Sequence, residues 1–231
     1  ARHVAAPQRH QAQAADRRQL FDLSQWWLQR MAATPRPLQE KLALLWHGHF
    51  AVSYRGCEDA YLLYQQNVMF REHATNFANL TRGIVRDPAM LIYLNNDRSR
   101  KDSPNENLAR ELMELFTLGE GNYTENDIKQ AARALTGYTR EDNDFHFREG
   151  AHDRGMKQIF GARGNFNGDH VANLCLARRP CAEFVAFKLY KHFVADIDEP
   201  ATLDRGQIEI IKAMGQRIRR DDYDLKPVLK M

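Results

Sequence analysis

The chain has little cysteine, and none of its three cysteines forms a Cys-x-x-Cys pair. Cysteine zinc sites are usually built from such pairs, so a site of this kind is not expected. Cys175 and Cys181 lie on either side of Pro180. They could form a local disulfide in an oxidising compartment, or they could be buried thiols that pack as small hydrophobic groups. The sequence leaves both alternatives open.

A strong charge imbalance and a long hydrophobic run are also missing. The 33 basic and 30 acidic residues leave a formal net charge of only +3, which argues against a nucleic-acid partner. No apolar run approaches the roughly 20 residues that a membrane-spanning helix needs, so no integral membrane segment is expected. The chain contains no Walker loop, dinucleotide-binding glycine motif, Gly-x-Ser-x-Gly motif or His-Glu-x-x-His motif. These absences argue against several common classes of enzyme.

What the chain does have is a succession of amphipathic helical patterns separated by proline and glycine. Its 43% hydrophobic content is sufficient for a real core. Helices are predicted over residues 15–31, 38–50, 58–70, 76–84, 87–94, 103–119, 124–137, 169–177, 181–194 and 203–218. We predict a mostly α-helical, bundle-like domain of many helices over residues 37–231. Residues 1–36 are predicted to be an N-terminal helical segment, and we interpret the chain as part of a longer protein.

The glycine-rich region 138–168 interrupts the helical pattern. Two short strands are predicted there, at residues 145–147 and 156–160. We expect them to form a small β-hairpin, near residues 145–160, that packs on the helices.

The helix predicted over residues 103–119 carries the densest set of chemically useful groups. Ser103 and Glu106 have the spacing of a capping box, and Gly119 is placed to end the helix in a left-handed conformation. Between them, one face presents the side chains of Asn107, Arg110, Glu111 and Glu114.

Two functions are open for this face. Glu111 or Glu114 could act as a general base or a metal ligand, with Arg110 holding an anionic group. The alternative is a salt-bridge ladder in which Glu106, Arg110 and Glu114 pair with one another and do no chemistry.

A second candidate site is the segment from His47 to His49. Both imidazoles could bind one ion if the chain turns at Gly48, and with Glu111 they would make a site for a divalent metal. On a regular helix the two side chains would point about 200° apart and could not share an ion. The alternative is that one histidine caps the end of the helix and the other is exposed.

A third candidate lies in the glycine-rich region, where His152 and Asp153 are followed by Lys157. A loop histidine beside an aspartate could shuttle protons. The alternative is turn chemistry, in which Asp153 initiates an Asp-Arg-Gly turn.

The chain resembles the bacterial family known as domain of unknown function 1800. The likeness covers roughly residue 37 to the C-terminus and rests on the motifs Trp46-His-x-His-Phe50, Asp87-Pro-Ala-Met-Leu-x-Tyr-Leu94, Asn105-Glu-Asn-x-Ala-Arg-Glu-Leu-Met-Glu-Leu-Phe-Thr-Leu-Gly119, Ala132-Arg-Ala-Leu-Thr-Gly-Tyr138 and His152-Asp-x-Gly-x-Lys157. Tyr138 stands where the family usually has tryptophan. The resemblance implies that the three candidate groups belong to the family's signature and that the protein is exported, but it implies no activity.

Two functional hypotheses follow. The first is an exported bacterial enzyme, a hydrolase or lyase of a polar polymer, located in the periplasm or secreted by a signal segment that is not in this chain. Its catalytic residues would be Arg110, Glu111, Glu114, His152 and Asp153. A co-exported protein or a polysaccharide could be its partner. The second hypothesis is a non-catalytic exported binding or scaffold protein whose polar cluster is structural. An enzyme should present these groups in an open cleft, whereas a scaffold should pair them and seal them from water.

Overall fold

Helices make up most of the computed structural model, which describes residues 6–197 and 202–231. The helices are α1 (Ala6–Ala33), α2 (Pro37–His49), α3 (Tyr54–Cys57), α4 (Ala60–Glu72), α5 (Phe77–Ile84), α6 (Pro88–Tyr93), α7 (Asn107–Glu111), α8 (Glu125–Ala134), α9 (Gly168–Ala177), α10 (Arg179–Phe193) and α11 (Arg205–Arg220). A π-helix, η2 (Leu112–Leu118), continues α7. The predicted mostly α-helical fold is confirmed.

Many helix starts are fixed by a side chain that accepts a backbone N–H left free at the first turn. The residues that cap helices in this way are Asp59, Asn76, Asp87, Thr124, Asn167 and Asp204. Thr124 does so in a full capping box with Asp127, as does Asn167 with His170. The starts predicted at Asn76, Asp87 and Thr124 are confirmed.

The helix predicted from Ser103 begins later, at Asn107, so the capping box predicted at Ser103 and Glu106 is wrong. The backbone N–H groups of Arg100 and Ser103 each donate to the carbonyl of the other residue, which holds Ser103 in a turn before the helix. The side chain of Asn105 instead accepts from the N–H of Asn107, at 2.8 Å. Gly119 follows the last helical residue with a φ of 75°, a conformation that favours glycine.

The glycine-rich region forms two β-hairpins, each a two-stranded antiparallel sheet. Strand β1 (Tyr138–Glu141) pairs with β2 (Asp144–Phe147), and β3 (Lys157–Ile159) pairs with β4 (Ala162–Gly164). The strand predicted at residues 145–147 is therefore extended, and so are residues 157–159 of the one predicted at 156–160, whereas Phe160 belongs to a turn. Each strand pairs with its own neighbour and not with the other. The turn between β3 and β4 has positive φ at Phe160 and Gly161, as the favoured two-residue hairpin turn requires.

Aromatic side chains form the centre of the core, where α2, α4 and α5 meet. Trp46, Phe50 and Phe77 are fully buried and lie within 6.4 Å of one another, ring centre to ring centre. The indole N–H of Trp46 donates to the carbonyl of Ala74 at 2.7 Å, so its one polar atom is satisfied.

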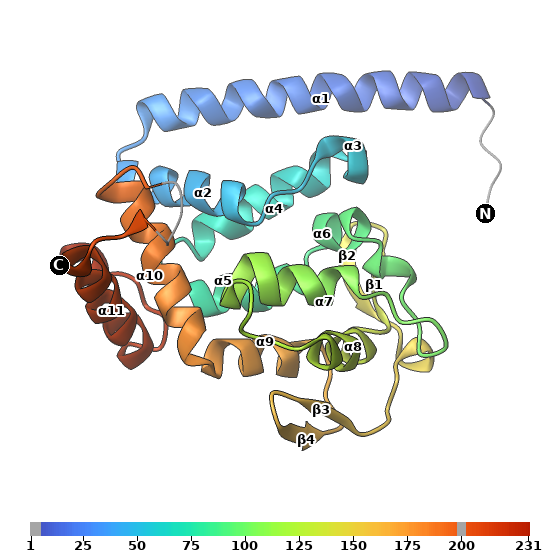
Figure 1. The fold of residues 1–231 in the computed structure, drawn as a ribbon. Helices are drawn as coiled ribbons and strands as arrows, with labels where there is room; N and C mark the ends of the chain where they lie inside the picture. Colours follow the sequence, from blue (N-terminus) through green and yellow to red (C-terminus); the bar gives the residue numbers. More distant parts are fainter. Residues whose placement is uncertain (1–5, 198–201) are drawn as a thin grey trace.

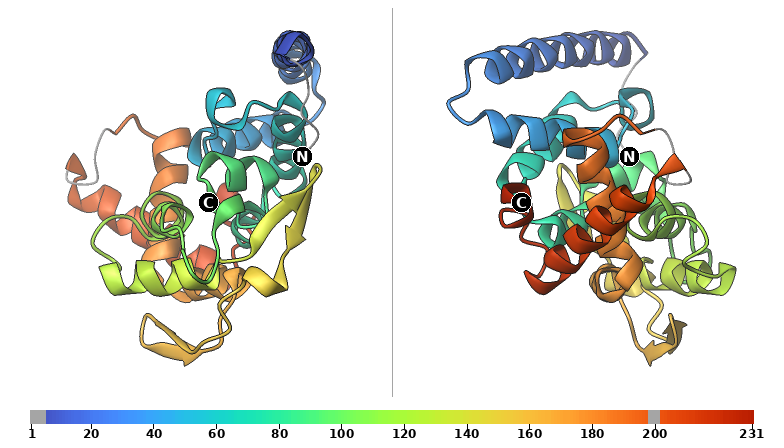
Figure 2. Two further views of the ribbon diagram at one scale, coloured as in Figure 1. Left: turned by 90° about the vertical axis from the view of Figure 1, so that its right-hand side faces the viewer. Right: turned by 60° about the vertical axis from the view of Figure 1, so that its left-hand side comes forward.

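Helix α1 runs along one side of the molecule, and the β3–β4 hairpin projects from the opposite end (Figures 1 and 2). The helices that carry the candidate site residues, α2 and α7, lie between these two extremes (Figure 1). Within the described residues, no helix combines the length and the apolar character that crossing a membrane demands.

Candidate functional site

The helix that carries Glu111 and Glu114 changes from α-helical to π-helical geometry between these two residues. In a π-helix the backbone hydrogen bonds join residues five positions apart, instead of the four positions of an α-helix. Turns of this kind are frequent at functional sites. The carbonyl of Phe116, inside this segment, accepts a hydrogen bond from Nε2 of His49 at 2.9 Å. A side chain from the end of α2 is therefore seated directly against the π-helix.

The contact with Phe116 fixes which tautomer His49 adopts when its ring is neutral. A carbonyl oxygen only accepts, so Nε2 carries the hydrogen and Nδ1 holds the lone pair of a neutral ring. Burial lowers the pKa of His49 to about 4, and the hydrogen bond to Phe116 only partly opposes this. The aromatic rings around it belong to Trp46, Phe50, Phe77, Phe116 and Phe184. His49 is therefore neutral at neutral pH.

His49 and Glu111 line the same hollow, which has a volume of about 500 Å³. This is within the range of small-molecule sites, roughly 300–1,000 Å³. The hollow lies between the end of α2, the end of α6 and the α7–η2 helix, and its lining residues are Gly48, His49, Ala51, Tyr93, Leu94, Glu111, Leu115 and Phe116.

Glu111 is the acidic group of this hollow. Among the described residues, no hydrogen bond or ion pair engages its carboxyl group, which is half-buried. Burial raises its pKa, and the negative charge of Glu114 raises it further, while Arg110 partly opposes both. An acid with a raised pKa and no partner is suited to proton transfer.

The neighbours of Glu111 on the helix are engaged elsewhere. Glu114 accepts a hydrogen bond from the hydroxyl of Tyr123. Arg110 binds Glu125 through two hydrogen bonds, each 2.9 Å long, and also contacts Glu106 at 3.4 Å. The expected ladder is therefore present only between Glu106 and Arg110. Arg110 is tied to an exposed carboxylate of α8 and does not hold Glu111.

His47 lies on a different side of α2 from His49, because this segment is a regular helix. Its ring packs edge-on against Trp27 of α1, with the ring centres 5.0 Å apart. The structure thus does not gather His47, His49 and Glu111 as the sequence predicted for a metal. In the part of the chain that the structure describes, no group of three or more His, Cys, Asp or Glu side chains is placed to hold a metal ion.

Two asparagines of the motif before α7 hold the loop that borders the hollow. The amide of Asn107 donates to the carbonyl of Leu94 at 3.5 Å, and that of Asn105 donates to the carbonyl of Asn95 at 3.3 Å. Leu94 itself lines the hollow. These side chains therefore position one wall and leave the reactive positions to other residues.

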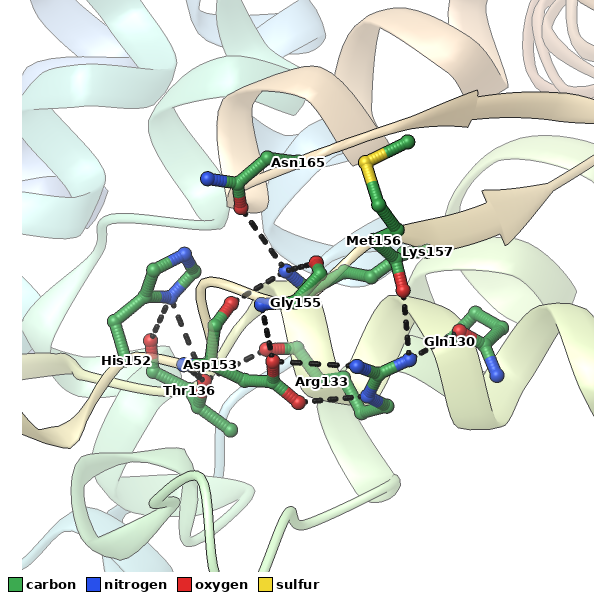
Figure 3. A network of polar contacts seen from close by, with 9 residues as sticks. All are labelled: Gln130, Arg133, Thr136, His152, Asp153, Gly155, Met156, Lys157 and Asn165. Carbon is green, nitrogen blue, oxygen red and sulfur yellow. Dashed lines mark hydrogen bonds and ion pairs between the residues drawn. The ribbon is translucent and has the colours of Figure 1, made fainter.

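His152 and Asp153 belong to a separate network that joins the end of α8 to the segment before β3 (Figure 3). Arg133 donates to Asp153 through Nε at 2.7 Å and through a terminal nitrogen at 3.2 Å. Nδ1 of His152 donates to the carbonyl of Thr136 at 2.8 Å. Lys157 is almost fully buried, and its ammonium group donates to the carbonyls of Asp153 and Gly155.

The network is closed on itself. The amide N–H of Asp153 donates to the hydroxyl of Thr136 at 2.8 Å, and the N–H of Gly155 donates to the carboxylate of Asp153 at 2.8 Å. The hydrogen bonds from Arg133 hold the pKa of Asp153 below its usual value, and burial lowers that of His152. Within the described residues, none of these bonds reaches His49 or Glu111. The geometry is that of the turn-forming alternative, with Asp153 as the turn residue.

A second hollow, of about 570 Å³, lies on the other side of His49, between α2 and α10. Sequence reasoning did not find its basic residues, Lys188, Lys191 and His192. Lys191 and His192 stand three and four positions after Lys188 on one predicted helix. This spacing could have indicated a basic helix face, because residues so spaced lie on the same side of a helix.

Cys175 and Cys181 are buried free thiols. Burial raises both pKa values, that of Cys175 to about 12, so neither is a thiolate at neutral pH. The structure therefore shows the alternative in which both pack as small hydrophobic groups.

Comparison with known proteins identifies the family and goes no further. No curated protein and no solved structure matches the chain. The sequence profile described as protein of unknown function (DUF1800) matches residues 1–231, which is the whole chain and includes the first helix, where no resemblance was recognised from motifs. The chain belongs to the DUF1800 family.

Proposed function

We propose that this protein is an exported enzyme, a hydrolase or lyase of a polar polymer, which acts by acid–base catalysis in the hollow between α2, α6 and α7. The observation that carries the proposal is that one hollow is lined both by the Glu111 carboxyl group, which has no hydrogen bond or ion pair among the described residues, and by the neutral imidazole of His49. A periplasmic or secreted location is part of the same proposal.

Glu111 transfers the proton in this mechanism. In its protonated form it donates to the oxygen of the leaving group as the bond in the polymer breaks. In hydrolysis, water adds to the other fragment, and Glu111 regains its proton from that water. In elimination, the carbon-bound proton lost from the substrate replaces it. Proton transfer by a positioned side chain typically contributes about 10²–10⁴-fold to the rate.

The surrounding residues tune this carboxyl group. The charge of Glu114, whose carboxylate accepts a hydrogen bond from Tyr123, raises the pKa of Glu111. His49 offers Nδ1 as a hydrogen-bond acceptor, because its Nε2 is committed to Phe116.

The test is a screen of the purified full chain against a panel of neutral and acidic polysaccharides and of peptidoglycan. New reducing ends report hydrolysis, and ultraviolet absorbance of an unsaturated product reports elimination. We expect one of these polymers to be cleaved by the wild type, and Glu111→Gln to reduce the rate by about 100-fold or more. Glu106→Gln, which lies directly before the first residue of α7 and is paired with Arg110, is the matched control and should retain activity. Cleavage of no polymer, or full activity of Glu111→Gln, would refute the proposal.

A second candidate function is that of a scaffold or binding protein, and the closed network around Asp153 favours it. Arg133, Asp153 and Lys157 satisfy one another and a set of backbone groups, as expected for a polar cluster that fixes packing (Figure 3). A scaffold would show binding of a polymer or protein without turnover. Glu111→Gln would then behave as the wild type in every assay.

A further inference from the structure

Gly48 lies at the boundary between the two hollows and lines both of them, as does its neighbour His49. It is the second-last residue of α2, and within a helix glycine is less favourable than alanine because it loses more backbone freedom on folding. Its φ is not in the left-handed region, so the backbone does not require glycine.

Packing does not require glycine at this position either. A Cβ built on Gly48 would meet no heavy atom of the described residues within 4 Å. By contrast, a Cβ on Gly56 would lie 2.5 Å from the ring of Tyr93, so there the neighbours account for glycine. The consequence of glycine at position 48 is that the space over α2 stays open, from the hollow with Glu111 to the hollow along α10.

The hollow along α10 is positively charged. Lys188 and His192 line it, and none of the described residues that line it is acidic. Burial and the charge of Lys191 lower the pKa of Lys188, and burial and the charge of Lys41 lower that of His192. At neutral pH Lys188 stays charged, whereas the lowered pKa of His192 leaves its imidazole neutral and able to donate one hydrogen bond. An ammonium group that is partly removed from water is stabilised by a bound anion.

The rings in the two hollows indicate which kind of anion. Phe184 and Phe187 line the charged hollow and Tyr93 lines the other, and such rings pack against the apolar faces of sugars. The described lining includes no arginine, the residue whose planar fork suits phosphate. An anionic polysaccharide fits this lining better than a nucleic acid.

We infer that the two hollows form one groove for an acidic oligosaccharide, which crosses α2 at Gly48 with carboxylates beside Lys188 and His192 and a glycosidic bond beside Glu111. The inference rests on the proposed function for its reactive end, whereas binding along the groove is independent of turnover. Gly48 is then a specificity-determining residue, because any side chain there narrows the crossing.

The test is calorimetric titration of the full chain with an oligogalacturonate of about six residues, using Glu111→Gln as well as the wild type so that turnover does not interfere. We expect both to bind, with affinity falling as salt is raised. Gly48→Leu should weaken binding at least about tenfold, and Lys188→Gln about fivefold. Lys129→Gln, the same change of charge on the exposed face of α8, is the matched control and should bind as the wild type.

Gly48→Ala separates folding from binding. We expect it to raise Tm by roughly 1–3 °C, because alanine favours the helix, while it weakens binding of the oligogalacturonate. If Gly48→Leu does not fold, the affinities of Gly48→Ala and Lys188→Gln for the oligogalacturonate test the groove in its place.

Three results would overturn the groove: no binding of the oligogalacturonate, equal binding of a neutral cello-oligosaccharide of the same length, or tighter binding of a single-stranded oligonucleotide. Wild-type affinity in both Gly48→Ala and Lys188→Gln would overturn it too. Binding of the oligogalacturonate by a wild type that cleaves no polymer of the panel would refute the proposed enzyme and leave the groove intact. Cleavage at the wild-type rate by the Gly48 variants would refute the groove and leave the proposed enzyme intact.

Discussion

At the scale of single residues, the two glutamates of the α7–η2 helix have different surroundings although they stand three positions apart. Glu114 accepts a hydrogen bond from Tyr123, whereas Glu111 faces a hollow with no hydrogen bond or ion pair from the described residues. The main influences on Glu111 are therefore burial and the charge of Glu114. The sequence identified both carboxylates as candidates, but only the packing of other segments around them distinguishes one from the other.

Replacing Glu114 tests this coupling. Glu114→Gln removes the negative charge that raises the pKa of Glu111, so the pKa of Glu111 should fall. If protonated Glu111 is the active form, the loss of activity at high pH should then begin at a lower pH than in the wild type. The pH profile of the cleavage rate measures this shift. A profile that moves to higher pH, or does not move, would contradict the assignment.

The acid sensitivity of folding tests the environment of His49. Its pKa is about 4 in the folded protein and about 6.5 in the unfolded chain, so the native state prefers the neutral ring. This contribution to stability is complete above about pH 6.5 and is lost as the pH falls toward 4. Because the ring borders two hollows and is not wholly sealed, we expect a loss of about 2 kcal/mol between pH 7 and pH 4.5.

His49→Gln is the matched variant, because its amide can still donate to Phe116 but does not titrate. Denaturant unfolding at the two pH values should show the wild type losing about 2 kcal/mol more than the variant. Equal losses would show that His49 is not held neutral.

At the scale of elements, capped helix starts were predictable and strand pairing was not. Asn76, Asp87 and Thr124 each precede an apolar helical pattern and cap it as expected. Ser103 also precedes such a pattern, but its backbone N–H and carbonyl form hydrogen bonds with Arg100 in a turn, so the helix does not begin there. The hairpins were missed as separate units because their strands are three or four residues long, and because the turn after Ile159 places Phe160 at positive φ, which few such residues adopt.

The network beside the hairpins should contribute stability and not catalysis. Lys157→Met keeps much of the apolar stem but removes the donor to the carbonyls of Asp153 and Gly155. Leaving buried acceptors unpaired should destabilise the fold by about 2 kcal/mol. Thermal or denaturant unfolding measures this cost, and Lys129→Met on an exposed face should change stability by less than about 0.5 kcal/mol.

The same variant separates the two candidate clusters. Oligogalacturonate affinity of Lys157→Met should equal that of the wild type wherever the variant is folded. A folded Lys157→Met with greatly weakened binding would place the network in the functional site.

At the scale of the whole molecule, α1 is attached through a buried carboxylate of α2. Glu40 accepts hydrogen bonds from Arg30 at 2.8 Å and Trp27 at 3.2 Å, both on α1, and from Arg71 of α4 at 2.9 Å. Burial raises the pKa of Glu40, but the hydrogen bonds from Arg71 and Arg30 outweigh it, so the net pKa is lowered. Arg71 also lies over the ring of Trp26, 4.8 Å from its centre.

Removing the charge of Glu40 should loosen α1. Glu40→Gln leaves the buried guanidinium of Arg71 without its counter-ion, which should cost about 2–4 kcal/mol. The fluorescence of Trp26 and Trp27 should shift to longer wavelength as their surroundings become wetter. Glu58→Gln, an exposed glutamate, is the control. An unchanged spectrum together with unchanged stability would show that α1 does not depend on this cluster.

The overall class of fold followed from the periodicity of the sequence, because each amphipathic helix needs only local residues to be recognised. The boundary between residues 1–36 and 37–231 stays a prediction. Contacts between residues far apart in the sequence could not be predicted from periodicity. Glu40 and Arg71 are 31 positions apart, and His49 contacts the carbonyl of Phe116, 67 positions away. The resemblance to a family grouped the three polar motifs, and the structure shows that His49 and Glu111 share a hollow while His152 and Asp153 form a separate network.

The most direct measurement compares Glu111→Gln and Asp153→Asn with the wild type on the polymer that the screen identifies, with folding of each variant verified by circular dichroism. We predict that Glu111→Gln loses about 100-fold or more in rate with little loss of stability, whereas folded Asp153→Asn keeps its rate within about threefold and loses stability. A wild-type rate in Glu111→Gln, or a comparable collapse of rate in a folded Asp153→Asn, would contradict it.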